Sequence, residues 1–371
     1  MPFSSFQGNA GTVRQMREML GRDRFPHAVI LSGPGGAGKY TLAQMTAKTM
    51  NCLNPPLQGD AGLPDFCGIC SNCTRIAQAD DLDARFAEAV EAREALKDSE
   101  KKDTRILIQS HPEVMVVPPD PPQMLIKIGQ VRRVIETIYF RPAETRRRIY
   151  IFTAASFMKE AANSLLKVLE EPPEFATIFL LAQNPGELLP TIRSRCIQYA
   201  LAPLATEKIV DDLATAHPEW TPEQRALVAR LSNGAIGKAR TFNLGEYAAA
   251  RKDALTILQS ATLGNDHSEL FRTTDSYRGG GDGKDKTNTL LRSLYGLLED
   301  LLMLQSGAGG LVRNTDVMQE LTRISQSVSF EWVQNASWRI GQVESGMRRN
   351  LLRSLSLDAM ATGLEGGGDG V

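Results

Sequence analysis

The sequence predicts an α/β protein with a parallel sheet flanked by helices, followed by helical domains. Short apolar runs alternate with helical patterns in the first half of the chain. A glycine-rich phosphate-binding motif lies between one such run and a helix, and strand signals stop after about residue 204. Apolar strands that alternate with helices are typical of a parallel sheet covered on both faces.

The order of these patterns predicts the elements. Strands are expected over residues 28–32, 114–117, 148–152 and 177–182, and helices over residues 11–21, 41–50, 128–139 and 159–169. Hydrophobic residues at helical spacing continue to the end of the chain, including leucines at i, i+3 and i+4 between residues 290 and 302. We expect most of these leucines to pack against one another in a helical core.

Four segments follow from this reading. We expect a phosphate-loop domain over 1–204, a small helical lid domain over 205–245, an all-helical domain over 246–365 and a disordered tail over 366–371. Within the first domain, the charge-dense residues 79–105 are expected to form a solvated helical insertion.

Composition is that of a soluble globular protein. The 371 residues are 42% hydrophobic and 23% charged, with a net charge of −1, so any nucleic-acid contact must come from local patches. The runs 132–133 and 146–148 contain only arginines, which either contact phosphate or form solvated faces. No run approaches the length of a membrane span and no signal peptide is visible, so we expect a cytoplasmic protein.

The phosphate loop (residues 33–41) matches the pattern G-x4-G-K-[ST] with one departure. Glycines let backbone N–H groups converge on phosphate, and the lysine reaches the β- and γ-phosphates. Tyr40 stands where a serine or threonine would bind Mg²⁺, and Thr41 lies about 100° further round the helix. Weak nucleotide binding without Mg²⁺ and an empty loop both remain open. The candidate nucleotide-binding residues are Gly33, Gly35, Gly36, Gly38, Lys39 and Thr41.

The strand at 148–152 lacks a second Mg²⁺ ligand, in addition to the hydroxyl missing at position 40. Phosphate-loop NTPases need a strand that ends in an aspartate for Mg²⁺. Here Thr153 and the next three residues offer no carboxylate, unless a different strand is the counterpart. We therefore predict no intrinsic ATP hydrolysis.

Four of the five cysteines follow the spacing C-x14-C-x2-C-x2-C. A C-x2-C turn directs two thiolates at one metal, and Zn²⁺ takes four tetrahedral ligands. Gly68 and Asn72 are expected to ease the turns, while the fifth cysteine, Cys196, is expected to be unreactive. We predict a structural zinc module over residues 52–73, with iron–sulfur ligation as its rival. The expected ligands are Cys52, Cys67, Cys70 and Cys73.

Four motifs identify a resemblance. They lie at residues 24–28, 111–113, 161–173 (AANSLLKVLEEPP) and 188–196 (LLPTIRSRC). Together they resemble the AAA+ subunits of bacterial DNA polymerase III clamp loaders over about residues 3–242. The resemblance implies an AAA+ domain with a zinc module at this place, a lid domain and an all-α collar that assembles the subunits.

Departures from the family pattern indicate a subunit that does not hydrolyse ATP. Gly237 stands where the motor subunit has a sensing arginine. Arg195 matches the arginine finger presented in trans to ATP in a neighbouring motor subunit, and an ordinary surface ion pair is its alternative reading. Asn184 matches a γ-phosphate sensor and is expected to be structural here.

The resemblance also implies partners. These are the motor (gamma/tau) and delta subunits of the loader, the sliding clamp indirectly and primed DNA through the complex. ATP or ADP is compatible with the loop but not required. Two rival functions stay open: an ATP-hydrolysing AAA+ subunit such as the motor, and a zinc-dependent DNA-binding protein that acts alone.

Overall fold

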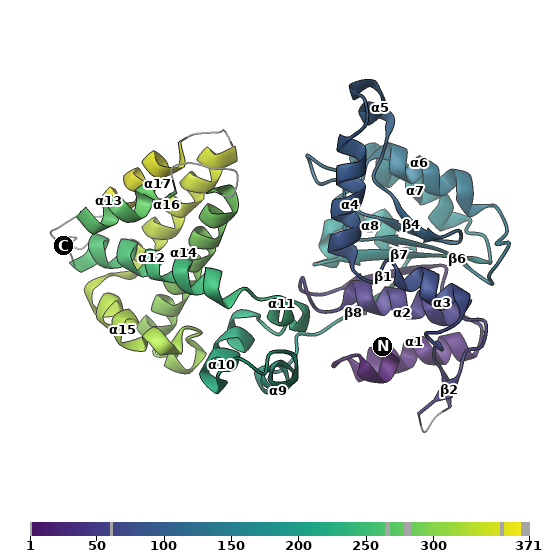
Figure 1. Cartoon of the computed structure of the whole chain (residues 1–371), viewed down its shortest axis with the longest axis horizontal. Helices are drawn as coiled ribbons and strands as arrows, with labels where there is room; N and C mark the ends of the chain where they lie inside the picture. The colour runs from purple at the N-terminus through teal and green to yellow at the C-terminus, as the bar shows by residue number, and fades with distance from the viewer. Residues whose placement is uncertain (1, 60–61, 264–267, 278–282, 349–351, 365–371) are drawn as a thin grey trace. The chain divides into compact units, whose positions relative to one another are not determined.

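The computed structural model describes residues 2–59, 62–263, 268–277, 283–348 and 352–364 (Figure 1). The chain divides into two compact units. Unit 1 comprises residues 1–205 and 233–238, and unit 2 comprises residues 206–232 and 239–371. The predicted boundary at residue 245 stays a prediction, and the predicted tail at 366–371 lies outside the described residues.

A six-stranded sheet forms the centre of unit 1, in the order β4-β5-β6-β7-β1-β8 (Figure 1). Five strands are parallel, which confirms the predicted sheet, whereas β4 runs antiparallel to β5 at one edge. The sequence did not reveal β4 and β8, the two edge strands. The strands are β1 (Ala28–Ser32), β4 (Ile108–His111), β5 (Val114–Val117), β6 (Arg148–Phe152), β7 (Ala176–Ala182) and β8 (Ile197–Ala200).

Helices cover both faces of this sheet, because successive strand residues point to opposite sides. In β1, Val29 and Leu31 enter one core, and Ala28 and Ile30 enter the other. The first core also contains side chains of α1 (Ala10–Gly21), α2 (Lys39–Asn51) and α3 (Ser71–Ala77). The second contains side chains of α6 (Ile128–Ile138), α7 (Lys159–Glu170) and α8 (Pro190–Arg193).

The charged segment after the cysteines forms α4 (Leu82–Glu94) and α5 (Asp98–Asp103). Most described residues of α4 are exposed, but Arg93 is buried and forms an ion pair with the fully buried Asp120. No sequence pattern predicted this contact. Unit 1 also contains a short antiparallel hairpin, β2 (Leu57–Gln58) with β3 (Leu63–Pro64), and two 3₁₀ turns, η1 (Phe3–Ser5) and η2 (Pro185–Glu187).

Every element described in unit 2 is helical. Of the seven leucines between residues 290 and 302, six are buried on α14 (Gly283–Gln305), and the seventh, Leu302, is partly buried against the same core. No described helix combines the length and apolarity that crossing a membrane requires.

Helix α11 (Ile236–Arg240) begins in unit 1 and ends in unit 2. The other elements are α9 (Thr206–Ala216), α10 (Pro222–Leu231), α12 (Leu244–Leu263), α13 (Ser268–Asp275), α14 (Gly283–Gln305), η3 (Gly309–Leu311), η4 (Thr315–Val317), α15 (Met318–Ser327), α16 (Phe330–Arg348) and α17 (Arg353–Thr362).

Candidate functional site

The phosphate loop connects β1 to the start of α2, and its glycines are required by its backbone. Gly33 and Gly38 have φ angles of 142° and 87°, which side-chain-bearing residues rarely adopt. A Cβ on Gly33 would lie 2.5 Å from the carbonyl oxygen of Leu201, and one on Gly38 would lie 2.9 Å from Phe6 Cε2. The loop is therefore held between the end of β8 and the N-terminal segment.

Lys39 is fixed within this loop. Its Nζ donates hydrogen bonds to the carbonyl oxygens of Gly33 at 2.6 Å and Pro34 at 2.8 Å. Burial lowers the pKa of Lys39, while the negative charge of Glu187 raises it. The ammonium thus lies beside the N-terminus of α2, where free N–H groups and the helix dipole favour an anion.

In the structure, Tyr40 connects α2 to the segment that follows α3. Its hydroxyl donates to the carbonyl oxygen of Ala79 at 2.5 Å and accepts from Gln44 Nε2 at 2.6 Å. Burial raises the pKa of Tyr40, so the phenol stays protonated. Thr41 is exposed on α2. The loop therefore fits a phosphate group, whereas Tyr40 offers no ligand to Mg²⁺.

The end of β6, separated from β1 by β7, is equally poor in metal ligands. Strand β6 ends at Phe152, and the N–H of Thr153 donates to the carbonyl oxygen of Val117 at 3.1 Å. Asn184 follows β7, and its side-chain oxygen accepts from the N–H of Gly186 at 2.8 Å, capping η2. This cap is a structural contact of the kind expected for Asn184.

Arg195 lies in the connection between α8 and β8, in a different sequence segment from the phosphate loop. Its Nη2 donates to Glu170 Oε1 at 2.6 Å, and its Nη1 donates to the carbonyl oxygen of Thr191 at 2.8 Å. One third of the Arg195 side chain remains exposed. Burial raises the pKa of the adjacent Cys196 to about 12, so this thiol stays protonated.

Some arginines of the runs considered as phosphate contacts form intramolecular ion pairs and hydrogen bonds instead. Arg147 pairs with Asp23 at 3.0 Å and donates to the carbonyl oxygen of Glu174 at 2.7 Å. Arg133 pairs with Glu136, one turn away on α6, at 3.4 Å. These contacts explain part of the basic clusters without nucleic acid.

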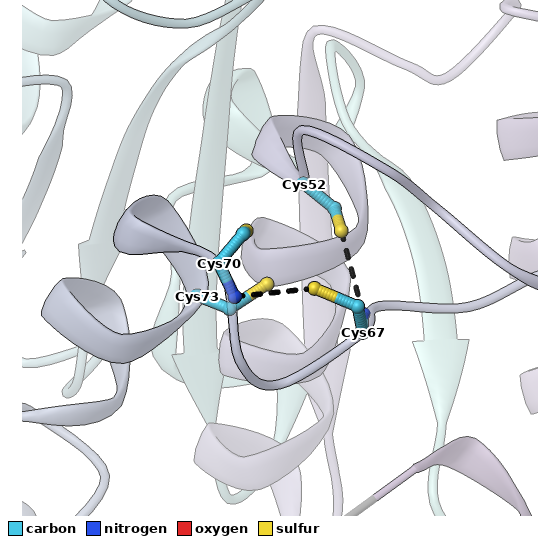
Figure 2. Close-up of side chains that lie close together, drawn as sticks. All are labelled: Cys52, Cys67, Cys70 and Cys73. Carbon is cyan, nitrogen blue, oxygen red and sulfur yellow. Dashed lines mark hydrogen bonds between the residues drawn. The ribbon is translucent and has the colours of Figure 1, made fainter.

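The four cysteines of the C-x14-C-x2-C-x2-C pattern come together at the far end of α2 (Figure 2). Cys52 caps the C-terminus of α2, Cys70 precedes α3 and Cys73 lies within α3. Their sulfur atoms all lie within 4.8 Å of one another. Four sulfurs placed about 2.3 Å from a tetrahedral zinc ion would be about 3.8 Å apart, so the cluster matches such a site after a small contraction.

Backbone N–H groups support this donor set. The N–H of Cys67 donates to Cys52 Sγ, and the N–H of Cys70 donates to Cys67 Sγ, both at 3.3 Å (Figure 2). Burial alone would raise the pKa of Cys70, but hydrogen bonds from the backbone of Leu53 and Cys73 lower it to about 6. Burial raises the pKa of Cys52 and Cys73. A dication would compensate the cost of placing four thiolates this close together.

Two buried amides, one missed by sequence reasoning and one given a different role, attach the cysteine cluster to the sheet. Asn72 was expected to ease a turn, but it lies within α3, and its Nδ2 donates to the carbonyl oxygen of Asn51 at 2.9 Å. Asn51 in turn exchanges two hydrogen bonds of 3.0 Å with the backbone of Arg147, just before β6. His111 Nε2 lies 3.3 Å from Asn72 Oδ1. Their positions beside Cys52 and Cys73 were the only signal in the sequence.

Comparison with known families decides the relationship. The model of the family described as DNA polymerase III, delta subunit, matches residues 8–205, more than half of the chain. The chain belongs to this DNA polymerase III delta subunit family. The match covers the phosphate loop, the cysteine cluster and Arg195.

Curated relatives of this delta subunit family member include several subunits of the same polymerase. The delta' subunit of Bacillus subtilis is 24% identical over 89% of this chain and 88% of its own length. The delta' subunit of Pseudomonas aeruginosa is 29% identical over 58% of this chain and 56% of its own. The tau subunit of Escherichia coli is 28% identical over 71% of this chain, which spans only 36% of tau.

Proposed function

We propose that this chain is the delta-prime type of AAA+ subunit in the DNA polymerase III clamp loader. In this role it does not hydrolyse ATP, and it helps to load the sliding clamp on primed DNA during replication. The motor and delta subunits are its direct partners. The observation that carries the proposal is the hydrogen bond from Tyr40 to Ala79. Because this bond uses the hydroxyl of the residue at the Mg²⁺-ligand position, that hydroxyl is not available to a metal ion.

The second element of the proposal is Arg195 as an arginine finger for a neighbouring subunit. A guanidinium inserted in trans stabilises the charge on a transferring phosphoryl group and accelerates hydrolysis by about 10³–10⁵-fold. The pair between Arg195 and Glu170 leaves both side chains partly exposed. Exposed pairs contribute about 0–1 kcal/mol, so releasing Arg195 toward another chain costs little.

The third element of the proposal is a structural zinc ion in the cysteine cluster, which would stabilise unit 1. Residues Cys52, Cys67, Cys70 and Cys73 would hold it, and a bound ion would fix the end of α2 to α3. Because all four positions would be taken by protein ligands, the ion would have no open coordination site for catalysis.

Unit 2 is proposed to assemble with other subunits. Its leucine stripe is used within its own core, so the contacts must come from other residues. Phe330 and Trp338, on α16, are more than 60% exposed. Exposed aromatic side chains of this size are common at protein interfaces.

Reconstitution of the loader tests the finger. The Arg195→Ala variant should assemble normally, while hydrolysis at the ATP site facing this subunit falls by about 10³-fold or more in single-turnover measurements. Glu170→Gln is the matched control, since it breaks the same ion pair but keeps the guanidinium. Normal hydrolysis by Arg195→Ala would overturn the assignment, and equal losses in both variants would indicate a structural pair.

The motor subunit is the alternative, because tau is among the relatives. It predicts Mg²⁺-dependent ATP turnover by the isolated chain that disappears in Lys39→Ala. The delta-prime proposal predicts no turnover by either protein.

A further inference from the structure

Two lysines from distant parts of the sequence meet at the phosphate loop. Lys39 belongs to the loop itself, and Lys238 belongs to α11. The residues around Lys238 belong to unit 1 together with the loop. The N–H of Gly237 donates to the carbonyl oxygen of Gly36 at 2.8 Å, which fixes the start of α11 against the loop.

The side chain of Lys238 follows the loop toward its first half. A Cβ built on Gly36 would lie 2.9 Å from Lys238 Cγ, and one built on Gly35 would lie 3.6 Å from Cε and 4.0 Å from Nζ. The aliphatic part of Lys238 therefore passes Gly36, and its ammonium group lies beside Gly35. The positive charge of Lys238 also lowers the pKa of Lys39, in addition to the larger effect of burial.

The position of this second cation follows from the backbone. A Cβ on Gly237 would lie only 2.9 Å from the carbonyl oxygen of Gly36 and 3.2 Å from its Cα. Residue 237 thus has to be glycine for α11 to approach the loop this closely. The next residue, Lys238, is the first that can direct a charged side chain along the loop.

Neither of the two ammonium groups is in direct contact with a carboxylate in the described residues. Within the described part of the chain, neither Lys39 nor Lys238 forms an ion pair. The charge of Glu187 acts on Lys39, but Glu187 Oε1 accepts a hydrogen bond from the N–H of Asn184 at 3.1 Å. The field at the loop therefore favours an anion.

In phosphate-loop enzymes Mg²⁺ neutralises much of the charge on the β- and γ-phosphates. Tyr40 and Thr153 remove the ligands that would hold this ion. We propose that the loop binds a di- or triphosphate chain without a divalent cation, and that Lys238 is a phosphate ligand which replaces part of the missing metal charge. The inference rests on the non-hydrolysing subunit proposed above, because an ATP-hydrolysing motor subunit would need Mg²⁺ at this loop. Its failure would leave that proposed function standing, since an empty loop also fits a subunit that does not hydrolyse ATP.

Titration of the full chain with ATP, ADP and inorganic tripolyphosphate tests the proposal by calorimetry. The buffer should be free of magnesium but contain no chelator, because a chelator would remove a metal ion bound by the cysteine cluster. We expect binding of ATP and ADP without Mg²⁺, and no increase in affinity when Mg²⁺ is added. Tripolyphosphate binding as tight as ATP would identify a general polyphosphate site, and weaker binding would identify nucleotide as the ligand.

Variants distinguish direct binding of phosphate by Lys238 from a general effect of positive charge on affinity. Lys238→Met should weaken binding by roughly tenfold or more, since a charge-assisted hydrogen bond is lost. Lys238→Arg should retain most of the affinity. Lys159→Met, which removes an exposed lysine from α7, should bind like the wild type. Unchanged affinity in a folded Lys238→Met, binding that requires Mg²⁺, or no binding by the wild type would each overturn the proposal.

Discussion

Helix α2 begins at the phosphate loop and ends at the cysteine cluster, and the two ends differ in the completeness of their sites. At the C-terminal end, four thiols lie within 4.8 Å of one another and two backbone N–H groups donate to their sulfurs. At the N-terminal end, the glycines and Lys39 keep the geometry of a phosphate site. The hydroxyl that would hold a metal there is replaced by Tyr40.

The contrast indicates that phosphate binding and metal binding are separable functions of a nucleotide site. Phosphate is bound mainly by backbone N–H groups, whose positions depend on glycine conformation. Metal binding depends on single side chains, so one substitution removes it without disturbing the loop. A cysteine cluster has no such separation, because every ligand is also part of the structural junction.

Removing one cysteine should produce the largest effect. We expect Cys73→Ser to abolish metal binding and to lower the free energy of unfolding of unit 1 by about 4 kcal/mol or more, as loss of a structural metal does. Metal analysis and urea denaturation measure the two quantities. Cys196→Ser, outside the cluster, is the control and should keep about one zinc per chain. A folded wild-type protein without metal would contradict the zinc assignment and remove the contrast between the two ends.

Removing the Tyr40 hydroxyl should have an intermediate effect. Tyr40→Phe leaves the carbonyl oxygen of Ala79 without its short hydrogen bond, and we expect a loss of about 1–3 kcal/mol in urea denaturation. Tyr199→Phe is the matched control, because the Tyr199 hydroxyl donates only to the sulfur of Met19, at 3.6 Å. Equal stability of the two variants would show that the Tyr40 hydroxyl is dispensable.

Changing Thr41 should have the smallest effect. Thr41→Ala alters an exposed helix position, so we expect a stability change within about 0.5 kcal/mol and no change in nucleotide affinity with or without Mg²⁺. The same titrations measure it. A Mg²⁺-dependent loss of affinity would make Thr41 a metal ligand, and the N-terminal end of α2 would then have kept part of a metal site.

Much of unit 1 could be predicted because its central strands are buried on both faces and read as apolar runs. The edge strands could not, since β8 reads Ile-Gln-Tyr-Ala and is largely exposed. Spacing predicted that the four cysteines come together, since they lie within 21 residues of one another in the sequence. Lys238 was not predicted, because about 200 residues separate it from the loop that it contacts.

The hydrogen bond from Tyr40 to Ala79 also bears on evolutionary history. Ala79 follows α3, which provides Cys73 to the cysteine cluster. Restoring serine or threonine at position 40 would return a hydroxyl to the metal position, but it would remove the phenol on which Ala79 and Gln44 depend. Reversion would therefore begin with a loss of stability. If the loop has lost Mg²⁺ as proposed, this cost opposes its recovery, and a lineage carrying Tyr40 is expected to keep its phosphate loop free of metal.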